Sequence, residues 1–124
     1  NRTDGFGGAI SFSGVNSGGM LQITNTVIEG NASARDGGGI AAEGTVTLDS
    51  VTVDDNSSDT RGGGIAMIGG SRFVATNSTI SSNRSTNDGG GFWAGNTGYD
   101  IVIVDSTIRD NESGADGGGI MVIG

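Results

Sequence analysis

One spacing recurs five times in the chain and never varies: an asparagine stands nine residues before the apolar residue that closes a glycine-rich stretch. The apolar residues follow one another at steps of 30, 25, 27 and 28 residues. The pairs are Asn1 and Ile10, Asn31 and Ile40, Asn56 and Ile65, Asn83 and Phe92, and Asn111 and Ile120. Self-similarity at a period of roughly 20–50 residues is typical of repeat architectures. The chain is therefore expected to build one structural unit several times.

The length variation of the repeat is confined to one place. Before each of the last four asparagines, apolar residues stand three and eight positions upstream: Ile28 and Ile23, Val53 and Leu48, Ile80 and Ala75, Ile108 and Ile103. All insertions fall between the glycine-rich stretch and the next fixed block. Solenoid repeats behave in this way, because insertions map to loops on one face.

Apolar and polar residues alternate inside each repeat, as in Val46 and Leu48 or Ile40 and Ala42. A period of two predicts strands, and no stretch shows a helical period of useful length. Three short strands per 25–30 residues, with equivalent positions stacked coil upon coil, describe an all-β parallel β-helix (β-solenoid) of about four and a half coils. We expect one β-helix segment, residues 1–124, with coils 1–30, 31–55, 56–82 and 83–110 and a partial coil 111–124.

Runs of three glycines, as in the sequence DGGGI, are predicted to be corners of the coil, because glycine adopts positive φ without steric cost. Asp36, Asp88 and Asp116 precede three of these runs, and Arg61 takes the same place in a fourth. Aspartate suits a bend because it hydrogen-bonds nearby backbone amides. The same three carboxylates are the weak candidates for a calcium site, although Arg61 interrupts their column. We expect no other cofactor.

The asparagine column has two interpretations. Stacked asparagines can hydrogen-bond along the coil axis as an amide ladder. Each is also followed at the second position by Ser or Thr, which makes Asn1, Asn31, Asn56, Asn83 and Asn111 formal N-glycosylation acceptors. Asn77 is a further acceptor outside the column. A second polar column, formed by Asn25, Ser50, Asn77 and Asp105, is interpreted as another corner.

Charge excludes several classes of partner and site. The net charge is −8, with no Lys among the six basic residues, which argues against nucleic acid and anionic membrane surfaces. No apolar run approaches the roughly 18 residues of a membrane-spanning helix, so no membrane insertion is expected in this segment. The chain has no His, Cys or Lys, so general bases and nucleophiles reduce to carboxylates. We expect no catalytic residue, with cleavage of a polysaccharide by paired carboxylates as an alternative.

The outward face of one strand offers a candidate ligand or partner surface. If Phe92 and Ala94 point inward, Trp93 points outward between Ala66 and Met121. Tyr99 and Asp100 lie on the adjacent variable loop. An aromatic platform beside polar groups suits a sugar or a protein, so Trp93, Tyr99, Asp100 and Met121 are predicted to form this surface. The alternative is that the loop or a neighbouring subunit covers Trp93.

A glycine-rich GGAI or GGGI paired with an aliphatic-x-x-Asn motif, as in Ile80–Asn83, resembles the repeat of the chlamydial polymorphic outer membrane proteins and of related bacterial surface proteins. The resemblance covers the whole chain, with Ile or Val where the chlamydial motif favours Phe. It implies a right-handed parallel β-helix at a cell surface with a role in adhesion, and it supplies no catalytic residue.

These observations predict a non-catalytic structural or adhesive segment of an extracellular or cell-surface β-helix. Expected partners are flanking coils of the same chain or other copies of it, and a host or cell-surface protein or a polysaccharide. Neither end of the sequence carries a solenoid cap, which suggests a segment of a longer β-helix. Two alternatives stay open: a fibre subunit that stacks through open coil ends, and part of a polysaccharide-binding or polysaccharide-cleaving enzyme.

Overall fold

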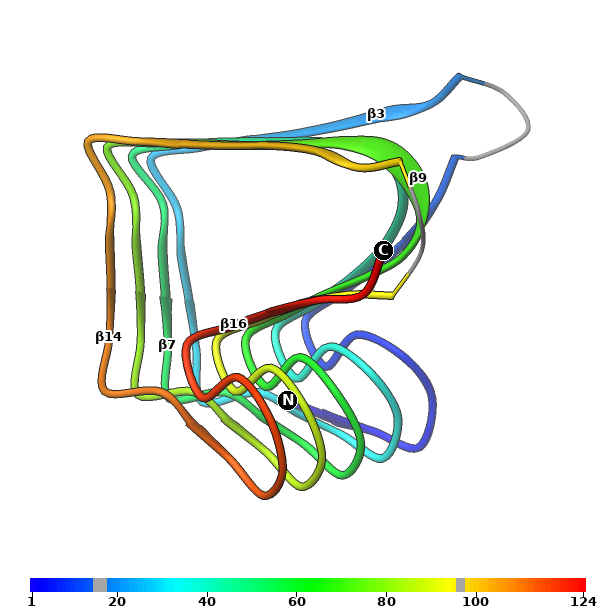
Figure 1. Ribbon diagram of the computed structural model, residues 1–124, viewed down its shortest axis with the longest axis vertical. Helices are drawn as coiled ribbons and strands as arrows, with labels where there is room; N and C mark the ends of the chain where they lie inside the picture. The colour runs from blue at the N-terminus through cyan, green and yellow to red at the C-terminus, as the bar shows by residue number, and fades with distance from the viewer. Residues whose placement is uncertain (15–17, 96–97) are drawn as a thin grey trace.

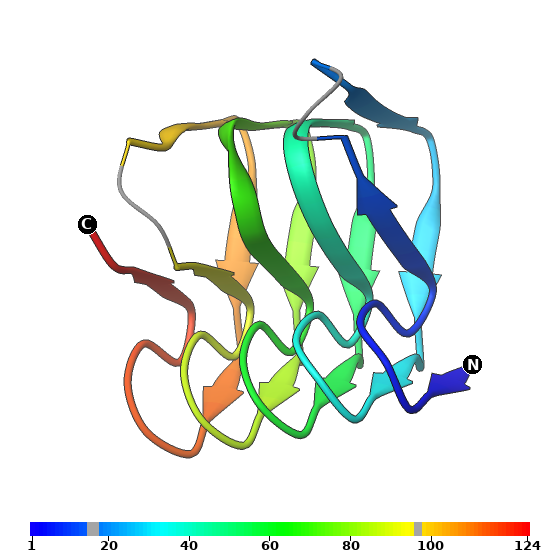
Figure 2. The same ribbon diagram turned by 90° about the vertical axis from the view of Figure 1, so that its right-hand side faces the viewer.

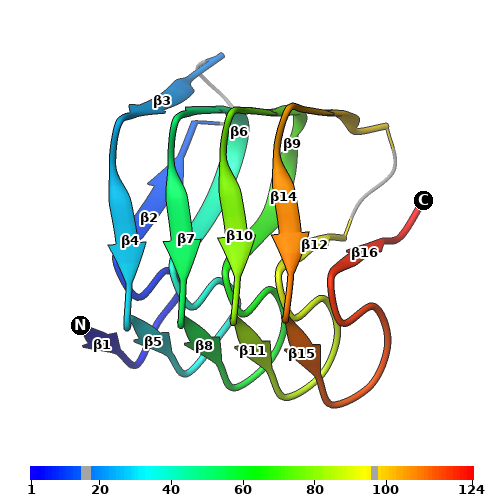
Figure 3. The same ribbon diagram turned by 90° about the vertical axis from the view of Figure 1, so that its left-hand side faces the viewer.

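The chain winds as a parallel β-solenoid in the computed structural model, which describes residues 1–14, 18–95 and 98–124. The described residues form strands, turns and bends and no helix, so none could span a bilayer as a long apolar helix. Figure 1 is a view along the coil axis, and Figures 2 and 3 show the coils side by side with their strands aligned. The predicted all-β parallel β-helix is confirmed.

Three parallel sheets run along the coil axis. The first sheet consists of β1 (Arg2–Thr3), β5 (Ala32–Ser33), β8 (Ser57–Ser58), β11 (Arg84–Ser85) and β15 (Glu112–Ser113). The second consists of β4 (Val27–Glu29), β7 (Thr52–Asp54), β10 (Thr79–Ser81) and β14 (Thr107–Arg109). The third consists of β2 (Ile10–Ser13), β3 (Met20–Thr24), β6 (Ile40–Asp49), β9 (Ile65–Thr76), β12 (Phe92–Ala94), β13 (Asp100–Val104) and β16 (Ile120–Val122).

The register of the coils follows the predicted columns. Ile40 pairs with Ile10 on one side and Ile65 on the other, and Phe92 pairs with Ile65 and Ile120. A shift of one residue would turn each apolar side chain out of the interior, so burial specifies this register.

Two coils depart from the expected three short strands. In these coils the variable segment is shortest, and the chain stays extended around the corner as β6, of 10 residues, and β9, of 12 residues. Pairing of β6 with β9 is irregular between Ala42 and Thr45, where Gly44 has a φ of 123°. In the neighbouring coils a longer connection separates β2 from β3 and β12 from β13.

Each corner of the coil places one residue in the left-handed region of φ. Asn25, Ser50, Asn77 and Asp105 have φ values of 48–57°, so the second polar column is a corner, as predicted. A further corner contains Gly30, Asp55, Ser82 and Asp110, directly before the asparagine column. Asn, Asp and Gly tolerate this conformation best, which explains why corners without a core role are still restricted in sequence.

The glycine run Gly62–Gly64 shows why three glycines are needed. Gly62 turns the chain with a φ of 64°. A Cβ at Gly63 would lie 2.4 Å from the Gly90 carbonyl oxygen of the next coil, and one at Gly64 would lie 2.9 Å from the side-chain amide of Asn83. The first glycine is therefore required by its φ, and the other two by close approach of the neighbouring coil.

The core is a narrow stack of aliphatic side chains with one aromatic pair. Phe73 and Phe92 lie with ring centroids 4.6 Å apart, and both are fully buried. Around them lie Ile40, Val46, Leu48, Val53, Ile65, Met67 and Ile80. These side chains occupy equivalent positions in successive coils, so the core is continuous along the coil axis.

Candidate functional site

The asparagine column lies inside the solenoid and forms a continuous chain of hydrogen bonds. Asn31 Nδ2 donates to Asn56 Oδ1, Asn56 Nδ2 to Asn83 Oδ1, and Asn83 Nδ2 to Asn111 Oδ1, each at a distance of 3.0 Å. Each acceptor oxygen also receives the backbone N–H of the preceding member at 2.9–3.0 Å. At the start of the column, the amino terminus of Asn1 donates to Asn31 Oδ1.

Burial distinguishes the inner asparagines of the column from Asn77, the N-glycosylation acceptor that lies outside the column. Asn56 and Asn83 are 1% and 0% exposed, and their Nδ2 atoms also donate to the Ile28 and Val53 carbonyl oxygens. A glycan on Nδ2 has no room in this fold. Asn77 at its corner and Asn1 at the end of the column are exposed, so these two acceptors remain open to modification.

The carboxylate column holds an ion pair. Asp36 is buried, and its Oδ1 accepts hydrogen bonds from the Thr60 hydroxyl at 2.6 Å and from Arg61 Nε at 3.0 Å. Its Oδ2 accepts from Arg61 Nη2 at 2.9 Å. Arg61 thus occupies the position next to Asp36 in which a cation would be held. Among the described residues, no group of three or more acidic side chains is placed to bind a metal ion.

The prediction that Trp93 is exposed is wrong. Its side chain has the opposite parity to Phe92, as expected, but only 3% of it is exposed. The Arg61 guanidinium lies over the indole ring, 4.1 Å from the centroid. The indole ring also lies close to the backbone of Gly95, where an added Cβ would be within 2 Å of the ring. The alternative interpretation, in which the chain itself covers Trp93, describes the structure.

The other members of the predicted surface have separate environments. Tyr99 is half-buried, and its hydroxyl donates to the Met67 carbonyl oxygen at 3.1 Å. Burial, and to a smaller extent the Glu43 carboxylate, raises the pKa of Tyr99 above its ordinary value of 10.0. Asp100 is exposed and pairs with Arg72. Met121 pairs with Trp93 in β16 and is partly buried. These side chains do not form one exposed platform.

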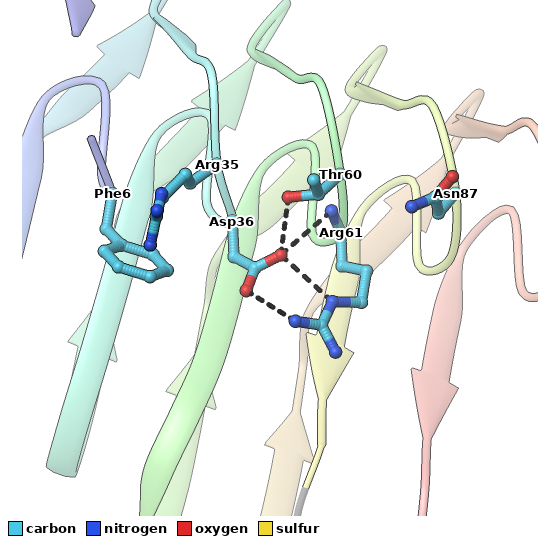
Figure 4. A pocket seen from close by; sticks show the side chains of 6 residues that line it. All are labelled: Phe6, Arg35, Asp36, Thr60, Arg61 and Asn87. Carbon is cyan, nitrogen blue, oxygen red and sulfur yellow. Dashed lines mark hydrogen bonds and ion pairs between the residues drawn. The ribbon is translucent and has the colours of Figure 1, made fainter. Parts of the chain in front are cut away.

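A pocket of about 360 Å³ lies where the glycine-run loops of four coils pass side by side (Figure 4). Phe6, Arg35, Asp36, Thr60, Arg61 and Asn87 line it. Arg35 lies over the Phe6 ring, with Cζ 5.1 Å from the centroid. The pocket therefore presents two guanidinium groups on aromatic rings, one of which is neutralised by Asp36.

This pocket was not predicted, although the sequence contains a signal for one contact beside it. Arg61 breaks the carboxylate column, Trp93 follows two alanines, Ala41 and Ala66, in its own column, and the structure brings these two departures into contact. In a repeat, a departure from one column next to a departure from another predicts a local interaction. Phe6 is a second departure from the carboxylate column, whereas Arg35 and Asn87 carry no such signal, because their column changes residue type from coil to coil.

Comparison with protein-family models gives one match over most of the chain. A model described as right handed beta helix region matches residues 5–123. Comparison with curated proteins and with solved structures found no match.

Proposed function

Because the chain belongs to the right-handed β-helix family, we propose that it is a rigid, non-catalytic segment of an extracellular or cell-surface protein, with a structural or adhesive role. The observation that carries this proposal is the buried asparagine ladder. It adds side-chain hydrogen bonds to the backbone bonds between coils along the axis, and both resist bending and separation of the coils.

The polar columns support a structural role because their side chains make hydrogen bonds and ion pairs within the chain. The ladder asparagines satisfy backbone groups of the coil next to them. Asp36 is committed to Arg61 and Thr60. Fold alone does not decide between enzymes and non-enzymes, so the assignment rests on these commitments and on the shortage of proton-transfer groups in the sequence.

Location and adhesion are tested together on intact cells of the source. Antibodies raised against the folded chain are expected to label intact cells as strongly as permeabilised ones. Beads coated with the chain are expected to adhere to a cell-surface protein or polysaccharide, and beads coated with heat-unfolded chain are not. Labelling that requires permeabilisation contradicts the proposed location.

Catalysis is tested separately with a panel of neutral and acidic polysaccharides. We expect no new reducing ends and no ultraviolet absorbance from unsaturated products. Release of products that is lost when one surface aspartate is changed to asparagine would show an enzyme and overturn the non-catalytic part of the proposal.

A further inference from the structure

We propose that the pocket lined by Phe6, Arg35, Thr60 and Asn87 binds a monoanionic carboxylate of about monosaccharide size, held by the Arg35 guanidinium. This inference goes beyond the structural and adhesive role and does not depend on it. A pocket of about 360 Å³ lies at the small end of the range in which proteins bind small molecules.

The two arginines of the pocket have different roles. The Nε–Nη2 edge of Arg61 is directed to Asp36, with Nε donating to Oδ1 and Nη2 to Oδ2, and the backbone N–H of Arg61 also donates to Oδ1. This pair is internally neutral and fixed against Trp93. Among the residues that the structure describes, Arg35 has no carboxylate within ion-pair distance, whereas Arg61, Arg72, Arg84 and Arg109 each have one.

Arg35 is oriented before any ligand binds. Its guanidinium lies over the Phe6 ring (Figure 4), a favourable cation–π arrangement that uses the face of the group and leaves its N–H edge free. A planar guanidinium edge matches a carboxylate through two parallel hydrogen bonds. Because the side chain is already ordered by Phe6, a ligand loses less entropy in fixing it.

The remaining lining suits a ligand that carries hydroxyl groups beside its carboxylate. The Thr60 hydroxyl donates to Asp36, so only its lone pairs are available, and it can accept a hydrogen bond from a ligand. The side-chain amide of Asn87 makes no hydrogen bond to another described residue and can both donate and accept. Donor and acceptor groups thus lie on the two coils that follow the coil of Arg35 (Figure 4).

Charge selects a monoanion. The chain has a net charge of −8, and within the pocket one guanidinium is neutralised by Asp36. One uncompensated positive group matches one negative charge. A phosphate group, with a charge of about −1.5 to −2, would leave excess negative charge in an acidic protein. We therefore expect a carboxylate to bind better than inorganic phosphate.

The test is a titration of ¹⁵N-labelled protein with sodium glucuronate at constant ionic strength, followed by NMR chemical shifts. Saturable shifts are expected at the Arg35 side-chain Nε–H and the Asn87 side-chain amide, with an affinity in the millimolar range. Glucose has the same ring without the carboxylate, and it should cause no saturable shift. A parallel titration with acetate, a monoanion without hydroxyl groups, distinguishes a requirement for the carboxylate alone from a requirement for the sugar hydroxyls as well.

Two variants assign the binding to Arg35. Arg35→Gln is expected to weaken glucuronate binding by about tenfold or more, because a charge-assisted hydrogen-bonded pair is lost. Arg84→Gln changes an exposed arginine outside the pocket and should bind like the unchanged protein. Both side chains are exposed, and circular dichroism will check that both variants fold.

Three results would overturn the proposal. These are equal binding of glucose and glucuronate, binding by Arg35→Gln with unchanged affinity, and tighter binding of inorganic phosphate than of glucuronate. Absence of any saturable shift with glucuronate and with acetate would overturn it as well, and would leave the proposed structural role unaffected.

Discussion

Asn83 connects three coils through a single side chain. Its Oδ1 accepts two N–H groups of Asn56, and its Nδ2 donates to the Val53 carbonyl oxygen and to Asn111 Oδ1. Because Asn83 is 0% exposed, water cannot replace any of these partners without opening the coil. The constant spacing of nine residues, from Asn83 to Phe92 in this coil, keeps the asparagine amides of successive coils in register.

Replacement of Asn83 by alanine is expected to lower the free energy of unfolding by about 2–4 kcal/mol. The Asn56 N–H would be left buried without a partner, at about 1–3 kcal/mol, and the Val53 carbonyl oxygen and Asn111 Oδ1 would each lose one donor. Urea denaturation measures the change. Asn87→Ala is the matched control, since its side chain makes no hydrogen bond to a described residue, and it should change stability by less than about 0.5 kcal/mol. Equal effects of the two substitutions would contradict the buried ladder.

Tyr99 makes stability depend on pH in a defined window. Its pKa is raised in the folded chain, so the unfolded chain loses the phenolic proton at lower pH than the folded chain does. Stability from this group is therefore fully present below about pH 10 and falls as the pH rises through the folded-state pKa. The chain has one Tyr, no Lys and no Cys, so few other groups titrate there.

Thermal melting of the unchanged protein and of Tyr99→Phe between pH 8 and about pH 11 measures this dependence. The variant should lose some stability at every pH, because the hydrogen bond to Met67 is absent, but its alkaline decline should be smaller. A decline of the same size in both proteins would show that Tyr99 does not cause it.

At the level of elements, the glycine-run loops fold against the outer face of the third sheet and make a second, smaller packing layer. Arg61 reaches from one loop to cover Trp93 on β12 and to pair with Asp36 on the loop of the preceding coil. Close contact between Gly89 and the Trp93 Cβ, where an added Cβ would lie 2.7 Å away, brings the loop near the strand. The outward side chains of Ala41, Ala66 and Trp93, which lie next to these loops, are therefore buried.

Arg61→Ala is expected to destabilise the protein by about 1–3 kcal/mol. It leaves the buried Asp36 carboxylate without its ionic partner, a cost that is reduced because the Arg61 side chain is 40% exposed. It also uncovers the only tryptophan, so the fluorescence emission of Trp93 should shift to longer wavelength.

Arg109→Ala serves as the comparison, because its pair with Asp110 is exposed and should contribute less than about 1 kcal/mol. Trp93 lies on a different sheet from Arg109, so this variant should leave its emission unchanged. An unshifted emission in Arg61→Ala would show that Trp93 is not covered by Arg61.

The strands and their register could be predicted from the sequence, but the second packing layer could not. The alternation of Val46 and Leu48, and the fixed offset from Asn56 to Ile65, each follow from short-range geometry that repeats in every coil. The burial of Trp93 depends on a single Arg61 and on the path of one loop, which have no counterpart in the other coils. Periodicity assigns Trp93 to the outer face and gives no information on what lies over that face.

The same distinction explains the pocket. Phe6, Arg35 and Asn87 come from coils 1, 2 and 4, and the column of Arg35 and Asn87 holds a different residue type in every coil. Their meeting depends on the solenoid bringing the loops side by side, so it becomes visible only once the coils are stacked (Figure 4). The buried asparagines, in contrast, could be predicted as a ladder because each member has the same neighbours.

For the whole molecule, stacking of coils sets like charges beside one another along the axis. Glu29 pairs with Asp54 in adjacent strands of the second sheet, and the Asp116 N–H donates to the carboxylate of Asp88 in the preceding coil. With a net charge of −8, repulsion between exposed acids opposes folding.

Screening is therefore expected to stabilise the protein, raising the melting temperature by several degrees between about 0.01 M and 1 M NaCl. KCl should act equally, because screening depends on ionic strength. A larger rise with low concentrations of calcium than with magnesium, at matched ionic strength, would contradict this account. It would support a calcium site at Asp36, Asp88 or Asp116 instead.

The measurement that tests the central claim most directly is hydrogen exchange of asparagine side-chain amides, followed by NMR in the folded protein. The buried ladder predicts slow exchange at Asn56 and Asn83, whose Nδ2 atoms are fully hydrogen-bonded, and fast exchange at the exposed Asn25, Asn77 and Asn87. Fast exchange at all five would contradict the ladder, and with it the stacking of coils on which the proposed rigid segment rests.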